Sequence, residues 1–398
     1  MNILHISPIY PFPPVMANQK DITGRLMLFK ELGHEVHSFS YPLPWQNFDV
    51  EKDEKKYGIK ICILERGFTY DAFRNRRFAY WYRTKPLLNR NSFRAVLDYV
   101  KKDEPSVIWL EYSTLSPLAS ILKDVSDAKI IIRAHNFELR HYWEKEWINI
   151  KEKKGGLSKL PYYLHNLLGI LYSEKLMLEK ADKVACISRE DLKLYKKYFR
   201  SKNVFYLPFY SSDRIIAHRP KKHIRVLNVF YMGSNLRNNV NRHGALYIVN
   251  KILPAVQKKY PGKFVFHILG KYGTEQLSDY TSGTVRVHDY VEDLNTFLEN
   301  MDIALLPVFY GTGFKVKTYE CLKRGFPTLG SPRAFRGFKG IDGEHFLTAD
   351  TPEAFAEELE KLLDKALRWK LSKNASELIK KDYSKGHIKK KLTRIIAT

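Results

Sequence analysis

The sequence is poor in cysteine and has no long apolar run. Its three cysteines, Cys62, Cys186 and Cys321, show no metal-site spacing and no even pairing, and each lies in an apolar pattern. We therefore interpret them as reduced structural thiols. No segment approaches the roughly 20 apolar residues that span a membrane as a helix. A strand pattern at residues 2–7 leaves no room for a secretory leader, so we expect a cytoplasmic protein.

Acidic residues are also scarce relative to basic ones. The 43 Asp and Glu stand against 67 Lys and Arg, which gives a formal net charge of +24. Such a charge attracts nucleic acid, anionic membranes or phosphorylated substrates. The sequence has no zinc-finger spacing, RNA-recognition signature or basic-zipper heptads, so we expect no nucleic-acid partner. It also lacks an Asp-x-Asp pair that would clamp a metal–diphosphate complex, so we expect no metal site. A solvated basic surface is the alternative explanation of the charge.

Two stretches of the chain alternate between strand patterns and helix patterns. The first runs to about residue 208, and the second begins with an apolar strand pattern at residue 226. The alternation predicts right-handed crossovers and a parallel sheet in each half, and 398 residues suit two domains. We expect an N-terminal domain over 1–208, a linker over 209–224, a C-terminal domain over 225–380 and a C-terminal helical segment over 381–398.

The most informative segment lies in the second half, where an apolar strand pattern at 303–308 leads into Gly311-Thr312-Gly313. A helical pattern follows over 315–324. Glycines let the backbone approach a ligand, and the first N–H groups of a helix have no internal partner, so the segment predicts an anion site. Lys315 and Lys317 add positive charge there. Glu320 lies further along the helix and can accept hydrogen bonds from sugar or ribose hydroxyls. The segment therefore predicts a nucleotide or nucleotide-sugar site. The alternative is a glycine turn without a ligand, since many α/β proteins have a turn of this kind that binds nothing.

Residues 311–327 closely resemble the donor motif G-T-G-x-K-x-K-x-x-E-x-x-x-x-G-x-P of GT-B glycosyltransferases, especially the family 4 type. The resemblance implies an α/β fold with two Rossmann-like domains facing a cleft, and a C-terminal helix that crosses back to the first domain. It implies that Glu320 holds the ribose and that the backbone amides of Gly313, Phe314 and Lys315 meet the diphosphate or the sugar. Many members have a second glutamate eight residues before the first, where this chain has Thr312.

The same resemblance extends to the opening of the second domain. Gly233 is expected to bring the backbone close to the donor. The family's arginine commonly follows this glycine, where this chain has Ser234. Arg237 and Arg242 are nearby replacements, and Arg237 is the candidate for the diphosphate. Gly270 follows the next strand at the same sheet edge, and Tyr290 is expected beside the base. The alternatives are a solvated loop arginine and a tyrosine that caps the core.

In the first half, the predicted strand at 129–133 carries His135 to its C-terminal end. The pattern R-x-H-N-x-E at 133–138 resembles a family element with a histidine near the donor sugar, which makes His135 a catalytic candidate with Asn136 beside it. Lys317 is the second catalytic candidate, because cations and helix N-termini stabilise charge on a departing diphosphate. The loop after the first strand is expected to frame the acceptor through Asn18, where the family often has glycines.

Two basic and aromatic stretches, residues 74–83 and 151–172, suit docking on an anionic membrane; amphipathic helices with core aromatics are the alternative. The predicted function is transfer of a hexose-type sugar from a nucleoside diphosphate donor, with UDP favoured, to a glycan or lipid-linked acceptor in polysaccharide biosynthesis. The resemblance implies retention of the anomeric configuration, with neither metal nor cofactor. The alternatives are a GT-B sugar-nucleotide epimerase and a non-catalytic GT-B partner subunit.

Overall fold

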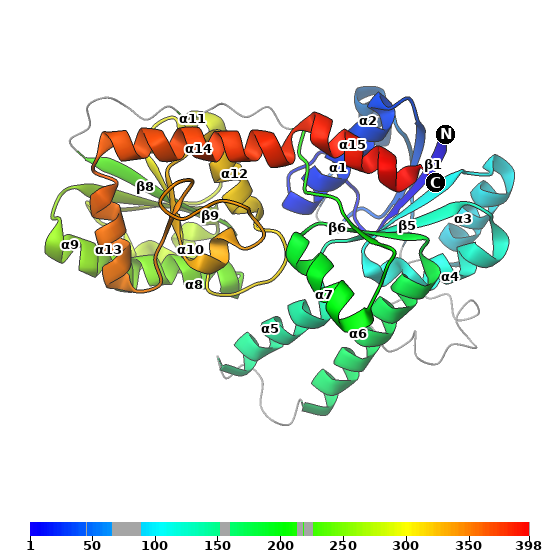
Figure 1. Ribbon diagram of the computed structural model, residues 1–398, viewed down its shortest axis with the longest axis horizontal. Helices are drawn as coiled ribbons and strands as arrows, with labels where there is room; N and C mark the ends of the chain where they lie inside the picture. The colour runs from blue at the N-terminus through cyan, green and yellow to red at the C-terminus, as the bar shows by residue number, and fades with distance from the viewer. Residues whose placement is uncertain (45, 66–88, 152–159, 213–217, 219–225, 398) are drawn as a thin grey trace. The chain divides into compact units, whose positions relative to one another are not determined.

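The computed structural model describes residues 1–44, 46–65, 89–151, 160–212, 218 and 226–397. The basic-aromatic stretch 74–83, residues 152–159 and most of the predicted linker lie outside the described residues. The chain divides into two compact units (Figure 1). The first contains residues 1–213, 312–314 and 385–398, and the second contains residues 214–311 and 315–384.

The first unit is built on a seven-stranded parallel sheet in the order β3-β2-β1-β4-β5-β6-β7. Its strands are β1 (Asn2–Ser7), β2 (Glu35–Ser40), β3 (Lys60–Ile63), β4 (Val107–Glu111), β5 (Lys129–Ala134), β6 (Lys183–Cys186) and β7 (Val204–Tyr206). Its helices are α1 (Ala17–Glu31), α2 (Val50–Tyr57), α3 (Arg90–Asp103), α4 (Ser116–Val125), α5 (Glu138–Lys151), α6 (Leu160–Lys180), α7 (Arg189–Phe199) and α15 (Lys385–Ile396).

Strand residues of this sheet alternate between two buried cores. Leu4, Ile108 and Ile132 belong to one core, whereas their neighbours Ile3 and Trp109 belong to the other. Both faces of each strand are therefore apolar, which is the pattern of a parallel sheet covered on two sides. The second core includes four apolar residues of α15, and both Lys385 and Lys389 pair with Glu31 of α1, so the C-terminal helix belongs to the first unit.

The second unit repeats this plan with a six-stranded parallel sheet in the order β10-β9-β8-β11-β12-β13. Its strands are β8 (Leu227–Asn235), β9 (Phe264–Lys271), β10 (Val285–His288), β11 (Ile303–Leu306), β12 (Thr328–Gly330) and β13 (Leu347–Thr348). Its helices are α8 (Asn239–Tyr247), α9 (Leu253–Lys259), joined by a π-helical turn (Ile248–Ile252), α10 (Gly273–Leu277), α11 (Leu294–Leu298), α12 (Val316–Arg324), α13 (Pro352–Lys361) and α14 (Lys365–Tyr383). The predicted parallel-sheet fold is confirmed.

Each sheet has one point where the strand order reverses. Strand β1 lies between β2 and β4, and β8 lies between β9 and β11. The connections leave in opposite directions on the two sides of such a strand and open a crevice at its carboxyl end, where open α/β sheets bind ligands. The residues that follow β1 and β4, and those that follow β8 and β11, are therefore brought together.

Four predicted boundaries are wrong: the sequence patterns begin the first helix at Asp21, end two strands at Gly233 and Gly270, and continue one helical segment to the C-terminus. Helix α1 begins at Ala17, because the Gln19 side chain accepts hydrogen bonds from the amides of Val15 and Met16 and caps its start. Asn18 therefore lies in the first turn of α1 and not in a loop. Strands β8 and β9 continue past Gly233 and Gly270. The helical pattern predicted near the C-terminus is interrupted at Ser384, whose backbone is extended.

Candidate functional site

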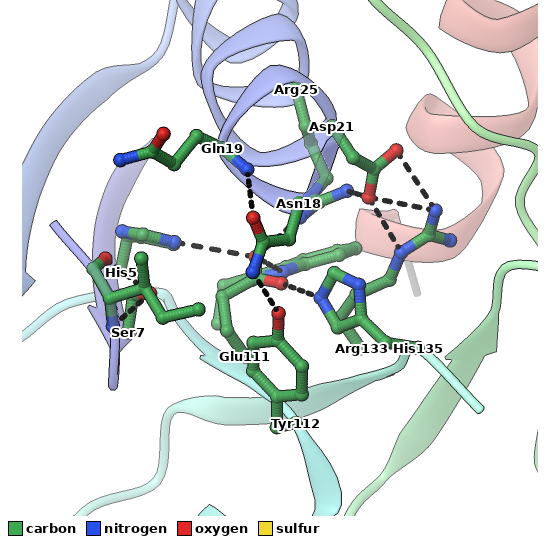
Figure 2. Close-up of polar contacts among 12 residues, drawn as sticks. His5, Ser7, Asn18, Gln19, Asp21, Arg25, Glu111, Tyr112, Arg133 and His135 are labelled. Atoms are coloured by element: carbon green, nitrogen blue, oxygen red, sulfur yellow. Dashed lines mark hydrogen bonds and ion pairs between the residues drawn. The ribbon is translucent and has the colours of Figure 1, made fainter. Parts of the chain in front are cut away.

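Four buried charged residues meet at the carboxyl edge of the first sheet (Figure 2). Asp21 and Arg25 come from α1, Glu111 ends β4, and Arg133 lies in β5; each is at most 3% exposed. Asp21 accepts hydrogen bonds from Arg25 Nη1 at 2.8 Å and from Arg133 Nη2 at 3.0 Å. Arg25 Nη2 donates to Glu111 Oε1 at 2.5 Å. Two carboxylates thus face two guanidiniums, and the formal charges balance.

His135 lies at the rim of this buried charge cluster, one residue after β5. Its Nε2 is 2.8 Å from Glu111 Oε2, and its ring stacks on Tyr112, with 4.0 Å between centroids and 19° between planes. Tyr112 has a φ of +72°, a backbone conformation that costs a non-glycine residue free energy and often marks a functional site. Asn18 Nδ2 donates to the Tyr112 hydroxyl at 3.1 Å. The structure therefore brings the two predicted residues Asn18 and His135 to the same tyrosine.

The cluster holds its carboxylates ionised. Burial alone would raise the pKa of Glu111, but the Arg25 charge and hydrogen bonds from His135 and His5 outweigh burial and hold the pKa well below its usual range. Burial would likewise raise the pKa of Asp21, and the charges of Arg133 and Arg25 lower it instead. Sequence reasoning missed this cluster. Its only signal was the presence of charged residues inside otherwise apolar strand patterns, as in Ile130-Ile131-Ile132-Arg133.

A second buried carboxyl supports the segment that carries Asn136. Glu174 Oε1 accepts hydrogen bonds from the Glu138 amide at 2.7 Å and from the Tyr195 hydroxyl at 2.8 Å. The same hydroxyl lies 3.2 Å from the backbone oxygen of Asn136. Glu174 therefore anchors the start of α5 directly behind His135 and Asn136. Burial raises the pKa of Glu174 to about 8, so this carboxyl is mostly protonated at neutral pH.

This raised pKa predicts that alkaline pH destabilises the first unit. The folded chain keeps a proton on Glu174 up to a pKa of about 8, whereas the unfolded chain releases it near 4.5. The associated stability is complete below pH 4.5 and is lost as the pH rises toward 8, by an amount on the order of 4 kcal/mol. Glu174→Gln should lack this loss, which melting temperatures measured from pH 5 to pH 8.5 will show. Glu179→Gln, an exposed change on the same helix, should keep the wild-type pH dependence.

In the second unit, Gly233 and Gly270 face each other where the pairing of β8 and β9 shifts register. A Cβ atom on Gly270 would lie 1.8 Å from the backbone oxygen of Gly233, and one on Gly233 would lie 2.5 Å from Leu236 Cδ2. Strand packing alone therefore requires glycine at position 270, where the obstacle is backbone, whereas a side chain at position 233 would have to displace the end of Leu236. Their predicted contact with the donor stays a prediction.

Lys317 and Ser234 share a partner that sequence reasoning missed. Lys317 Nζ donates to Asn241 Oδ1 at 2.6 Å, and Asn241 Nδ2 donates to Ser234 Oγ at 3.3 Å and to the Asn235 oxygen at 3.0 Å. Burial lowers the pKa of Lys317 to about 8. Asn241 thus connects the end of β8 to the start of α12, and a cation lies between these two segments.

The start of α12 has the geometry of an anion site. Gly311 and Gly313 adopt φ values of +93° and +71°, a conformation suited to glycine. Lys315 occupies the N-cap position, and its Nζ donates to the Gly311 oxygen at 2.7 Å instead of capping the helix. Further along, the Thr318 hydroxyl donates to the Ala334 oxygen at 2.7 Å and anchors the first turn. Glu320 follows on α12 and is partly buried. Thr312 and Phe314 complete the loop between β11 and α12.

Arg237 and Tyr290, which the sequence predicts to contact the nucleotide-sugar donor, have surroundings that were not expected. The Arg237 guanidinium pairs with Glu275, with Nε 3.0 Å from Oε1, and lies 3.8 Å from the centre of the Tyr272 ring. Tyr290 is 71% exposed, in the connection between β10 and α11.

In the residues that the structure describes, no three His, Cys, Asp or Glu side chains are grouped as metal ligands. None of the helices in the described ranges is both long and apolar enough to cross a membrane.

Part of the chain is similar in sequence to a known family, and the whole chain is similar in fold to solved structures. Residues 227–365 match the family described as Glycosyl transferases group 1. A sucrose-phosphate synthase from Thermosynechococcus elongatus has a similar structure, with a TM-score of 0.70 and 15% identity over 99% of this chain and 98% of that chain. Anabaena Alr3699/HepE in complex with UDP has a TM-score of 0.67 and 10% identity over 100% of both chains. WaaG, a glycosyltransferase involved in lipopolysaccharide biosynthesis, has a TM-score of 0.63 and 14% identity over 100% of both. No curated protein matches this chain in sequence. The structural similarities confirm the predicted GT-B fold.

Proposed function

We propose that this glycosyltransferase of GT-B fold transfers a hexose-type sugar from a UDP-type donor to a hydroxyl group of a glycan or lipid-linked acceptor. The proposal rests mainly on the start of α12. Two glycines in the left-handed conformation precede this helix, and the side chain of the N-cap residue Lys315 does not cap it. A helix N-terminus of this kind attracts phosphate through its amides and its dipole. The family match of residues 227–365 includes this whole segment.

In the proposed complex, the backbone of Gly313, Phe314 and Lys315 binds the diphosphate, and the Glu320 carboxylate accepts hydrogen bonds from the ribose hydroxyls. Lys317, with a pKa of about 8, is mostly protonated at neutral pH, and a bound diphosphate would favour its charged form further. Its charge would stabilise the diphosphate as the sugar leaves. Thr312 and Ser234 border the same segment, and Gly233, Gly270, Arg237 and Tyr290 remain proposed donor contacts.

The first unit contributes His135 to the transferred sugar in this proposal, and Asn18 and Asn136 lie on the acceptor side. Asn18 and His135 both contact Tyr112 at the carboxyl edge of the first sheet, and Asn136 follows His135 in the chain. UDP is the proposed nucleotide because the similar structure of HepE was determined with UDP, with UDP and glucose, and with UDP-glucose. We further propose retention of the anomeric configuration and no requirement for a metal or cofactor, since Lys317 and the α12 amides supply positive charge at the diphosphate.

A donor screen tests the function. Purified protein is heated with UDP, GDP and their common sugar conjugates, and the donors are then incubated with and without glycan acceptors. We expect one nucleotide series to raise the melting temperature and its sugar to be transferred or slowly hydrolysed. Conversion of the donor sugar without any acceptor would indicate an epimerase. Binding without turnover on any acceptor would indicate a non-catalytic subunit, and absence of nucleotide binding by the folded protein would refute the proposal.

Membrane docking belongs to the same proposal, because it would bring a lipid-linked acceptor to the enzyme at the inner face of a membrane. Helix α6 lies beside α5 (Figure 1), and one stripe of α6 is apolar and exposed. Leu160, Leu164, Leu168 and Leu171 are 42–66% exposed and follow one another at helical spacing. Residues 160–172 contain no Asp, Glu, Lys or Arg. An apolar stripe on a chain with a net charge of +24 suits an anionic lipid surface.

The stripe predicts that vesicle binding depends on its leucines. Leu164→Ser with Leu168→Ser should reduce partitioning onto anionic phosphatidylglycerol vesicles by at least about tenfold, since each buried leucine contributes about 1.5–3 kcal/mol. Flotation of the two proteins with the vesicles measures this difference. Leu363→Ser, at an exposed position in the second unit, should float like wild type. Equal flotation of the double variant and the wild type would show that the stripe does not bind the membrane.

A further inference from the structure

The hydrogen bond between His135 and Glu111 decides which ring nitrogen of His135 carries a proton. His135 Nε2 lies 2.8 Å from Glu111 Oε2. An ionised carboxylate only accepts hydrogen bonds, so Nε2 must donate. A neutral imidazole has one N–H, and its other nitrogen is then an acceptor. Among the described residues, no group hydrogen-bonds to Nδ1 of His135.

We propose that Glu111 is the positioning residue that keeps His135 in the tautomer protonated on Nε2, so that Nδ1 is presented as a hydrogen-bond acceptor to a hydroxyl of the transferred sugar. The contact between Nδ1 and the sugar rests on the proposed function, whereas the tautomer of His135 is a property of the chain alone.

The surroundings of Glu111 keep it ionised. Oε1 accepts from Arg25 Nη2 at 2.5 Å and from Trp109 Nε1 at 2.9 Å, and His5 Nε2 lies 3.3 Å away. Burial and the Arg25 charge lower the pKa of His5, although hydrogen bonding to Glu111 opposes them, so His5 is neutral at physiological pH. Asp21 pairs with Arg133 and with Arg25. The four formal charges of Asp21, Arg25, Glu111 and Arg133 balance within the cluster.

The ring of His135 is also prevented from rotating. One of its faces lies against Tyr112, whose strained backbone and hydrogen bond from Asn18 hold the phenol ring in place. The Tyr112 amide donates to the Arg133 oxygen at 2.9 Å, so the strained turn is tied to the strand that carries His135. With Nε2 bonded to Glu111, a ring flip would break this hydrogen bond and leave a buried carboxylate oxygen without it. Nδ1 therefore has a defined direction.

This arrangement selects among donors. A neutral acceptor nitrogen binds a sugar that offers a free hydroxyl at the contacted position, and it gains nothing from a deoxy or O-methyl sugar there. A neutral nitrogen of His135 would bring no positive charge to the sugar. Lys317 and the α12 amides would stabilise the negative charge of the diphosphate.

The test is NMR of the full chain with ring-¹⁵N-labelled histidine at neutral pH, with His135→Gln used to assign the signals. We expect His135 to show a protonated-type Nε2 and an unprotonated-type Nδ1. A proton on Nδ1, or protons on both nitrogens, would overturn the proposal. This measurement uses wild-type protein and needs no turnover. A result as expected in a protein that transfers no sugar would therefore reject the proposed function alone.

Glu111→Gln extends the test. Its amide can donate to Nε2, so we expect the proton to move to Nδ1. Under the proposed function, kcat should fall about 10–100-fold while the UDP-induced rise in melting temperature stays unchanged. Glu179→Gln on α6 is the matched control and should retain both the wild-type signals and the wild-type kcat. A folded Glu111→Gln with unchanged signals and unchanged kcat would contradict the positioning role. If this variant does not fold, the wild-type spectrum decides.

Discussion

Replacing Asp21 by Asn is expected to destabilise the first unit by about 3–5 kcal/mol, the usual cost of removing one partner from a buried ion pair. Arg133 donates to both oxygens of Asp21, and Arg25 and the Tyr210 amide donate as well. Without the Asp21 charge, two buried guanidiniums face the single carboxylate of Glu111. The melting temperature of the first unit should fall by roughly 10 °C, which calorimetry measures directly.

Asp98→Asn is the matched control, because Asp98 lies exposed on α3. It should melt within about 1 °C of wild type, as surface changes usually do. Adding Arg133→Met to Asp21→Asn tests the cause: it removes an unpaired charge, so the double variant should be more stable than Asp21→Asn. An Asp21→Asn variant that melts like the Asp98 control would show that the buried charge cluster contributes little to stability.

Replacing Glu320 by Ala is expected to weaken UDP binding about 100-fold. Under the proposed function its carboxylate accepts hydrogen bonds from two ribose hydroxyls, and hydrogen bonds to a charged group contribute about 1.5–3 kcal/mol each. The UDP-induced rise in melting temperature depends on ligand concentration relative to Kd, so it should nearly disappear at concentrations that saturate the wild type. Titration calorimetry gives the two dissociation constants.

Glu377→Ala provides the comparison, since Glu377 is exposed on α14 of the same unit. Its melting temperature without UDP and its response to UDP should both match the wild type. Equal UDP responses of the Glu320 and Glu377 variants would place the nucleotide elsewhere, and the proposed role of α12 would have to be abandoned.

The fold and the start of α12 were predictable because their signals are local. Apolar strands alternating with helical patterns require parallel sheets, whichever residues later contact one another. The segment Gly311–Glu320 contains the turn, the helix start and the charges within ten residues, so its geometry depends mainly on its own backbone. The left-handed glycines at 311 and 313 and the glycine at 325 that ends α12 agree with this reading.

The starts and ends of elements were harder to predict, because side chains and neighbouring strands move them. Gln19 caps α1 earlier than the apolar pattern indicated. The register shift between β8 and β9 carries both strands past their glycines. At Gly270, the nearest obstacle to a side chain is the backbone of Gly233, a contact that no feature of either glycine's own sequence neighbourhood announces.

By itself, the sequence determined two parallel-sheet units, the glycine turn that leads into α12 and the placement of His135 at a strand end. Only the tertiary structure decided what surrounds these residues. Asp21 and Arg133 are 112 residues apart in the chain and meet because β1 and β5 flank β4 in one sheet. The partner of His135 is likewise Glu111, from the neighbouring strand. Local patterns report which face of an element is apolar. Pairing between buried charges depends on strand order and register, and these arise only when the whole sheet is assembled.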